Sequence, residues 1–129
     1  MKTLAAVLLA AAVCSPASLA APSATLRVHQ IVATGSPLPV EGAIPYIRVS
    51  RADGSTVARR RLPTGTRPVG VQLAPGRYRL QSWQRYCDGN CSRLGPPSDR
   101  CARWFRIGAG RTLKATIVVR YGSGCRIRF

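Results

Sequence analysis

The sequence predicts a single all-β domain, an antiparallel sandwich or barrel of about seven to eight short strands. Three observations support this fold class. Apolar and polar residues alternate with a period of two in most segments, no segment shows helical periodicity, and glycine- or proline-containing turn signals separate the segments. The length of 129 residues allows one domain.

Each expected strand is recognised by the apolar residues that the alternation places on its inward side. In Leu26 to Val32, for example, Arg27 and His29 fall on the opposite side. The expected inward sets, in chain order, are Leu26, Val28 and Val32, then Ile47 and Val49, then Val69, Val71 and Leu73, then Tyr78 and Leu80, then Phe105 and Ile107, then Leu113, Ala115, Ile117, Val119 and Tyr121, and finally Ile127 with Phe129.

Turn signals lie between these runs, because glycine and proline favour the backbone conformations that end a strand. They are Gly35-Ser36-Pro37, Ala52-Asp53-Gly54, Pro63-Thr64-Gly65, Pro75-Gly76, Gly108-Ala109-Gly110 and Gly122-Ser123-Gly124.

Residues 1–20 are typical of a secretory signal peptide, with Lys2 as the positive start, Leu4 to Val13 as the apolar stretch and Ser18-Leu19-Ala20 as the cleavage signal. Lipidation of Cys14 is the alternative, but Val13 stands where a small residue is needed. The apolar stretch is too short to span a membrane. We expect residues 21–129 to form the mature domain, secreted into the extracellular space or associated with the cell wall.

Composition excludes several function classes. The chain has 20 Lys and Arg against 4 Asp and Glu, one His, and a net charge of +16, which becomes +15 when Lys2 is removed with the signal peptide. A hydrophobic fraction of 46% argues against a disordered basic tail. Few carboxylates and one imidazole leave little for acid–base catalysis, so we expect no enzyme, cofactor or metal.

One run of residues has a family resemblance. Leu73-Ala74-Pro75-Gly76-Arg77-Tyr78-Arg79-Leu80, preceded by Pro39-Val40-Glu41-Gly42-Ala43 and Arg51-Ala52-Asp53-Gly54, resembles the prealbumin-like sandwich of carboxypeptidase-regulatory and collagen-adhesin B-type domains over about residues 24 to 86. The resemblance implies a Pro-Gly turn joining two strands, a following Tyr packed inward, and a secreted or surface-attached module without catalysis. An immunoglobulin-like sandwich is the alternative architecture.

The mature chain keeps four cysteines, Cys87, Cys91, Cys101 and Cys125, which predict two disulfides in an exported protein. If the strands ending at Tyr86 and beginning at Ala102 form a hairpin, Cys87 pairs with Cys101 and Cys91 with Cys125. Pairing of Cys87 with Cys125 and Cys91 with Cys101 is the alternative. The cysteine spacing matches no standard zinc site.

Two further roles are open for the cysteine-bounded loop. Asp88 and Asp99 could act as an acid–base pair in a small secreted hydrolase, although fixing the loop is the simpler role for both. The same oxygens, with those of Asn90, would make a weak calcium site in a basic neighbourhood. Arg93-Leu94 could serve as the bait bond of a protease inhibitor. His29, within an alternating strand, is interpreted as a surface residue.

The best candidate for binding is a stripe of basic and aromatic residues. If Tyr78 and Leu80 face the core, the pleat places Arg77, Arg79, Gln81, Trp83 and Arg85 on the opposite side of the same strand. Guanidinium groups suit phosphates and carboxylates, and an indole offers a stacking surface. We therefore expect a non-enzymatic module that contacts anionic extracellular polymers, such as a wall polymer, a glycan or nucleic acid.

Overall fold

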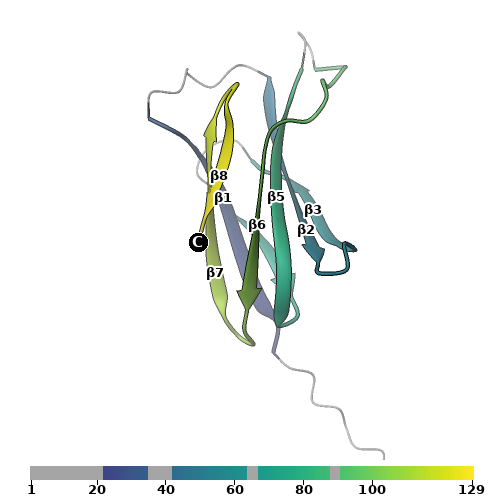
Figure 1. Ribbon diagram of the computed structural model, residues 1–129, viewed down its shortest axis with the longest axis vertical. Coiled ribbons are helices and arrows are strands. Elements are labelled where there is room, and N and C mark those ends of the chain that lie inside the picture. Colours follow the sequence, from purple (N-terminus) through teal and green to yellow (C-terminus); the bar gives the residue numbers. More distant parts are fainter. Residues whose placement is uncertain (1–21, 35–41, 64–66, 88–90) are drawn as a thin grey trace, which may run out of the picture.

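The computed structural model describes residues 22–34, 42–63, 67–87 and 91–129. In these residues the chain forms eight strands and no helix, which confirms the all-β prediction (Figure 1). The predicted signal peptide, residues 1–20, lies outside them. The strands are β1 (Ala24–Val32), β2 (Ala43–Arg51), β3 (Thr56–Arg61), β4 (Val69–Leu73), β5 (Gly76–Tyr86), β6 (Ser98–Ile107), β7 (Thr112–Arg120) and β8 (Gly124–Arg128).

The strands build two four-stranded sheets, with the orders β4-β1-β7-β8 and β3-β2-β5-β6. Figure 1 shows the sheets as two layers facing each other. The main hydrophobic cluster draws on both, with Leu26 and Ile117 from one sheet and Ile47 and Leu80 from the other, all four fully buried. The core is therefore the layer of side chains between the sheets.

The expectation of an entirely antiparallel fold is wrong at one place, because β1 and β7 pair in parallel, with Val28 opposite Ala115. The other strand pairs are antiparallel. Alternation of apolar residues carries no information on strand direction, which is why the sequence does not reveal this pair.

The alternation itself is confirmed in the core. The buried inward side chains are Leu26, Val28, Ile47, Val49, Val71, Leu73, Tyr78, Leu80, Phe105, Ile107, Ala115, Ile117, Val119 and Ile127. Four residues expected to face inward, Val32, Val69, Leu113 and Tyr121, are half-buried. Phe129 lies beyond the end of β8 and is 40% exposed, with its ring 5.3 Å from that of Phe105.

The Pro75-Gly76 turn carries the chain from β4 in one sheet to β5 in the other. Tyr78 follows it with its ring buried, and its hydroxyl donates a hydrogen bond of 2.6 Å to the carbonyl oxygen of Ala74. The bond satisfies the phenol within the sandwich and fixes the direction in which β5 begins.

The four cysteines form two disulfides, as expected, but both pairings considered from the sequence are wrong. Cys87 is bonded to Cys91, and Cys101 is bonded to Cys125. The expected β5–β6 hairpin exists, but β6 begins at Ser98 rather than Ala102, so Cys101 lies opposite Ser82. Five residues of strand separate Ser82 from Cys87, about 16 Å, which is too far for a disulfide.

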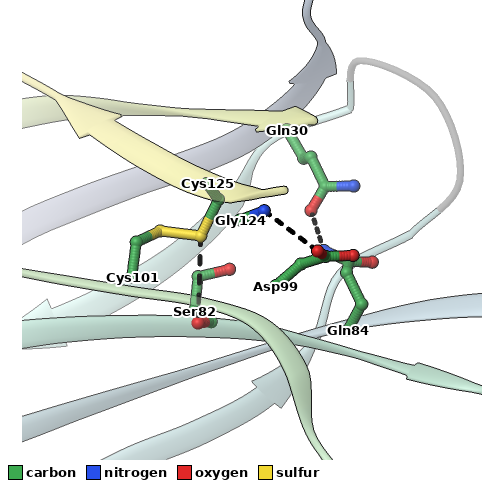
Figure 2. Close-up of a disulfide and its surroundings, with 7 residues drawn as sticks. All are labelled: Gln30, Ser82, Gln84, Asp99, Cys101, Gly124 and Cys125. Atoms are coloured by element: carbon green, nitrogen blue, oxygen red, sulfur yellow. Dashed lines mark hydrogen bonds between the residues drawn. A yellow bond between two sulfur atoms is a disulfide. The ribbon is translucent and has the colours of Figure 1, made fainter. Parts of the chain in front are cut away.

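Cys101–Cys125 joins the two sheets, since Cys101 belongs to β6 and Cys125 to β8 (Figure 2). It closes a loop with a sequence separation of 24, whereas Cys87–Cys91 closes one of 4. A longer loop removes more conformational entropy from the unfolded chain. The disulfide between the sheets is therefore the stronger constraint on unfolding.

We predict that replacing both Cys101 and Cys125 by Ala lowers the free energy of unfolding by about 3.5 kcal/mol, and that replacing both Cys87 and Cys91 lowers it by about 2 kcal/mol. Urea unfolding of the two double variants measures both values. Peptide mapping of the oxidised protein checks the pairing itself. An equal loss in the two variants, or a peptide joining Cys87 to Cys101, would contradict the assignment.

Candidate functional site

The stripe predicted on β5 lies on the outward side of its sheet. Tyr78, Leu80 and Ser82 are buried toward the core, so the pleat turns the intervening residues outward. Arg77 is exposed, and Arg79 is half-buried. We call the outward side of β3-β2-β5-β6 the basic face, and its arginines include Arg48, Arg59, Arg61, Arg77, Arg79, Arg100 and Arg106.

Trp83 belongs to the basic face but is covered by its neighbours. Its side chain is only 9% exposed. Its ring stacks on Tyr46 of β2, with centroids 5.8 Å apart and an interplanar angle of 11°, and the Arg59 guanidinium carbon lies 5.2 Å from the ring centroid. The expectation of an open stacking surface at Trp83 is therefore wrong. Its ring instead positions Arg59 by a cation–π contact.

Arg85 is the second departure from the expected stripe. Its Nε donates to the carbonyl oxygen of Gly95 at 2.8 Å, and its Nη2 donates to that of Leu94 at 3.2 Å. These bonds hold the loop before β6 against the sheet, and the Gly95 amide donates in turn to the Tyr86 carbonyl. The guanidinium of Arg85 is thus used within the protein.

A hollow of about 440 Å³ lies on the basic face above Gln81. Pairing between strands brings its residues together, with Arg59 opposite Arg48, Arg48 opposite Gln81, and Gln81 opposite Ala102. The lining residues are Arg48, Arg59, Arg79, Gln81, Ser82, Trp83, Pro97, Arg100, Cys101 and Ala102. Each of the four strands of the sheet supplies one of the four arginines.

Arg48 is held in place at the hollow, because its Nε donates a 2.8 Å hydrogen bond to Gln81 Oε1. It lies directly opposite Arg59 on β3. Like charges in opposite positions repel one another and destabilise the sheet. An anion placed between the guanidiniums would remove this repulsion, so the hollow favours negatively charged groups.

Trp104 is the functional candidate that the sequence analysis missed. It is 42% exposed, lies opposite Arg79 in the β5–β6 register, and has the Arg77 guanidinium carbon 4.7 Å from its ring centroid. The alternation in the sequence could have identified it, because placing Phe105 and Ile107 inward turns Trp104 outward. Trp104 provides the exposed aromatic surface that we had expected from Trp83.

The loop residues considered for inhibition and catalysis have other surroundings. Arg93 is exposed, while Leu94 is half-buried and its backbone bridges to Cys87. Asp88 and Asn90 lie outside the described residues. His29 is half-buried, with Nε2 3.5 Å from Thr116 Oγ1.

Asp99 joins the start of β6 to the turn between β7 and β8 (Figure 2). It adopts a positive φ of 48° and accepts hydrogen bonds from the Tyr86 hydroxyl at 2.5 Å, the Gly124 amide at 3.0 Å and the Gly122 amide at 3.3 Å. Nearby, Gln84 Nε2 donates to Gln30 Oε1 at 2.8 Å between the sheets. Asp99 thus has a structural role in fixing this end of the sandwich.

In the part of the chain that the structure describes, no three His, Cys, Asp or Glu residues lie together as metal ligands, and no helix has the length and apolar character to cross a membrane. Comparisons of the chain with family models, with curated proteins and with solved structures each found no match. A functional proposal therefore rests on the geometry of the basic face.

We predict that alkaline pH destabilises the protein through two half-buried phenols, those of Tyr86 and Tyr121. Burial and the Asp99 carboxylate raise the pKa of both Tyr86 and Tyr121 above the usual value of 10.0. The folded state therefore favours the neutral phenols, and stability is full below about pH 10 and is lost as the pH rises further. In urea unfolding between about pH 8 and about pH 11, Tyr86→Phe should lose stability less steeply than the parent protein. Equal slopes would contradict this.

Proposed function

We propose that this protein is a secreted, non-enzymatic module that binds an anionic extracellular polymer through its basic face. The observation that carries the proposal is the hollow, where Arg48, Arg59, Arg79 and Arg100 meet from four strands. Arginine is the cation best suited to recognising phosphate, sulfate and carboxylate groups, because its planar fork donates two parallel hydrogen bonds.

Export is supported by residues 1–20 and by the two disulfides, which persist in oxidising compartments. Removal of that segment leaves a net charge of +15, one less than that of the full chain. A charge of this size attracts polyanions over a distance and raises their local concentration. The basic face then provides the contacts at short range.

A prealbumin-like sandwich is part of the proposal. It is supported by the Pro75-Gly76 turn, which joins strands of different sheets, and by the inward packing of Tyr78 after it. Both features were expected from the family resemblance. This fold class hosts binding and structural modules, so it agrees with a function without catalysis, although a fold alone does not determine a function.

The surroundings of the hollow favour a polymer over a small ligand. The exposed pair Arg77 and Trp104 lies beside the hollow, since Trp104 is opposite Arg79, which lines the hollow. A chain lying across the sheet can therefore contact guanidiniums in the hollow and an indole beside it. Alternating cationic and aromatic contacts are the common mode of binding a charged polymer without strong sequence preference.

The test is the salt dependence of binding to heparin, polyphosphate and double-stranded DNA. We predict that replacing Arg48, Arg59 and Arg79 by Gln reduces the slope of log K against log salt concentration by about 2 to 3. Each arginine that contacts a phosphate or sulfate group releases about one counterion on binding, and the variant no longer makes these contacts. Trp104→Ala should weaken binding with the slope unchanged.

The matched control replaces Arg27, Arg126 and Arg128 by Gln, which removes the same charge from exposed positions on the other sheet. This control should change the slope much less than the first variant does. Circular dichroism verifies that both variants are folded. If the salt slope falls by the same amount in both variants, the interaction is a diffuse effect of net charge and the basic face is not the site.

A further inference from the structure

The hollow has a shape that follows from one small side chain. Arg59, Arg48, Gln81 and Ala102 form a row that crosses four adjacent strands, and adjacent strands are about 4.8 Å apart. Ala102 contributes only a methyl group at the β6 end of this row. On β5, the long side chains of Arg79 and Trp83 flank Gln81 on either side. The result is a depression with a low floor and cationic walls.

The lining of the hollow donates hydrogen bonds and offers few acceptors. Each guanidinium carries five N–H donors and no acceptor. Gln81 Oε1 is already occupied by Arg48, and none of the lining residues that the structure describes is acidic. A ligand that fills the hollow must therefore accept hydrogen bonds without donating its own, as an ionised oxyanion does and a neutral sugar, whose hydroxyl groups also donate, does not.

A second observation points to a ligand at the same place. Trp83 Nε1 is a buried donor with no hydrogen-bond partner in the described part of the chain, and Trp83 lines the hollow. An unpaired buried donor costs free energy. Arg59 lies over the Trp83 ring, so rotation of Arg59 toward a bound anion changes the surroundings of the indole.

We propose that the hollow is a discrete site for a tetrahedral oxyanion, a phosphate or sulfate group carried by the polymer. The inference deepens the proposed function and rests on it. A planar carboxylate is satisfied by one or two arginine forks in its own plane. A phosphate or sulfate monoester directs three terminal oxygens to different sides, which matches guanidiniums that arrive from four separate strands.

The experiment follows the two indole N–H signals of the protein by ¹H–¹⁵N NMR, since the chain has 2 tryptophans. Trp104→Phe identifies the Trp83 signal. Inorganic phosphate, sulfate and acetate are titrated separately at constant ionic strength. We expect the Trp83 signal to shift saturably with phosphate or sulfate, and at least about tenfold more weakly with acetate. Comparison of phosphate with sulfate shows whether the site prefers a phosphorylated or a sulfated polymer.

The variant Ala102→Leu fills the floor of the hollow without changing the charge of the protein. It should abolish the saturable shift, while Ala109→Leu, at an exposed turn position outside the hollow, should keep it. A Trp83 signal that does not move, that moves equally with acetate, or that still responds in Ala102→Leu overturns the proposal. Polymer binding of Ala102→Leu is measured in parallel, and polymer binding that persists at a normal salt slope shows that the basic face functions without a discrete site.

Discussion

The packing of β5 in the core is the constraint on which the rest of this structure depends. Leu80 is fully buried against residues of both sheets, and a shift of β5 by one residue would turn it to solvent. With Leu80 inside, Arg79 and Gln81 must face outward. β2 and β6 pair with β5 on either side, so Arg48 and Ala102 are brought beside Gln81. The composition of the basic face thus follows from hydrophobic burial on the opposite side of the same strands.

Alternation was sufficient to predict every strand except β3, together with most of the inward residues and the outward stripe on β5, because one face of each strand packs on the core. The prediction failed where apolar and polar residues do not alternate clearly along the strand. Ser98 to Arg103 at the start of β6 has no apolar alternation, so the strand seemed to begin later, and the disulfide pairing was misjudged. The hollow had no local signal at all, since its arginines come from four segments and meet only through strand register.

Arginines that look alike in the sequence perform different tasks here. Arg85 binds the carbonyl groups of the loop before β6, and Arg103 donates to the Ile127 carbonyl at 3.0 Å while lying over the Phe129 ring. Arg48 and Arg59 are instead held opposite each other, at a cost in repulsion. A count of basic residues cannot separate these groups. The difference lies in whether a backbone carbonyl is within reach of each guanidinium.

The parallel pairing of β1 with β7 has a consequence for the order in which the chain folds. Residues 43–107 contain every strand of the β3-β2-β5-β6 sheet, so this sheet can form while the end of the chain is still being synthesised. β1 can pair with β4, which is made early, but its other neighbour is β7, whose residues lie about 90 positions further along the chain. Contacts between such distant segments form slowly, because a long loop must close first. β1 therefore completes its pairing later than the strands of the other sheet do.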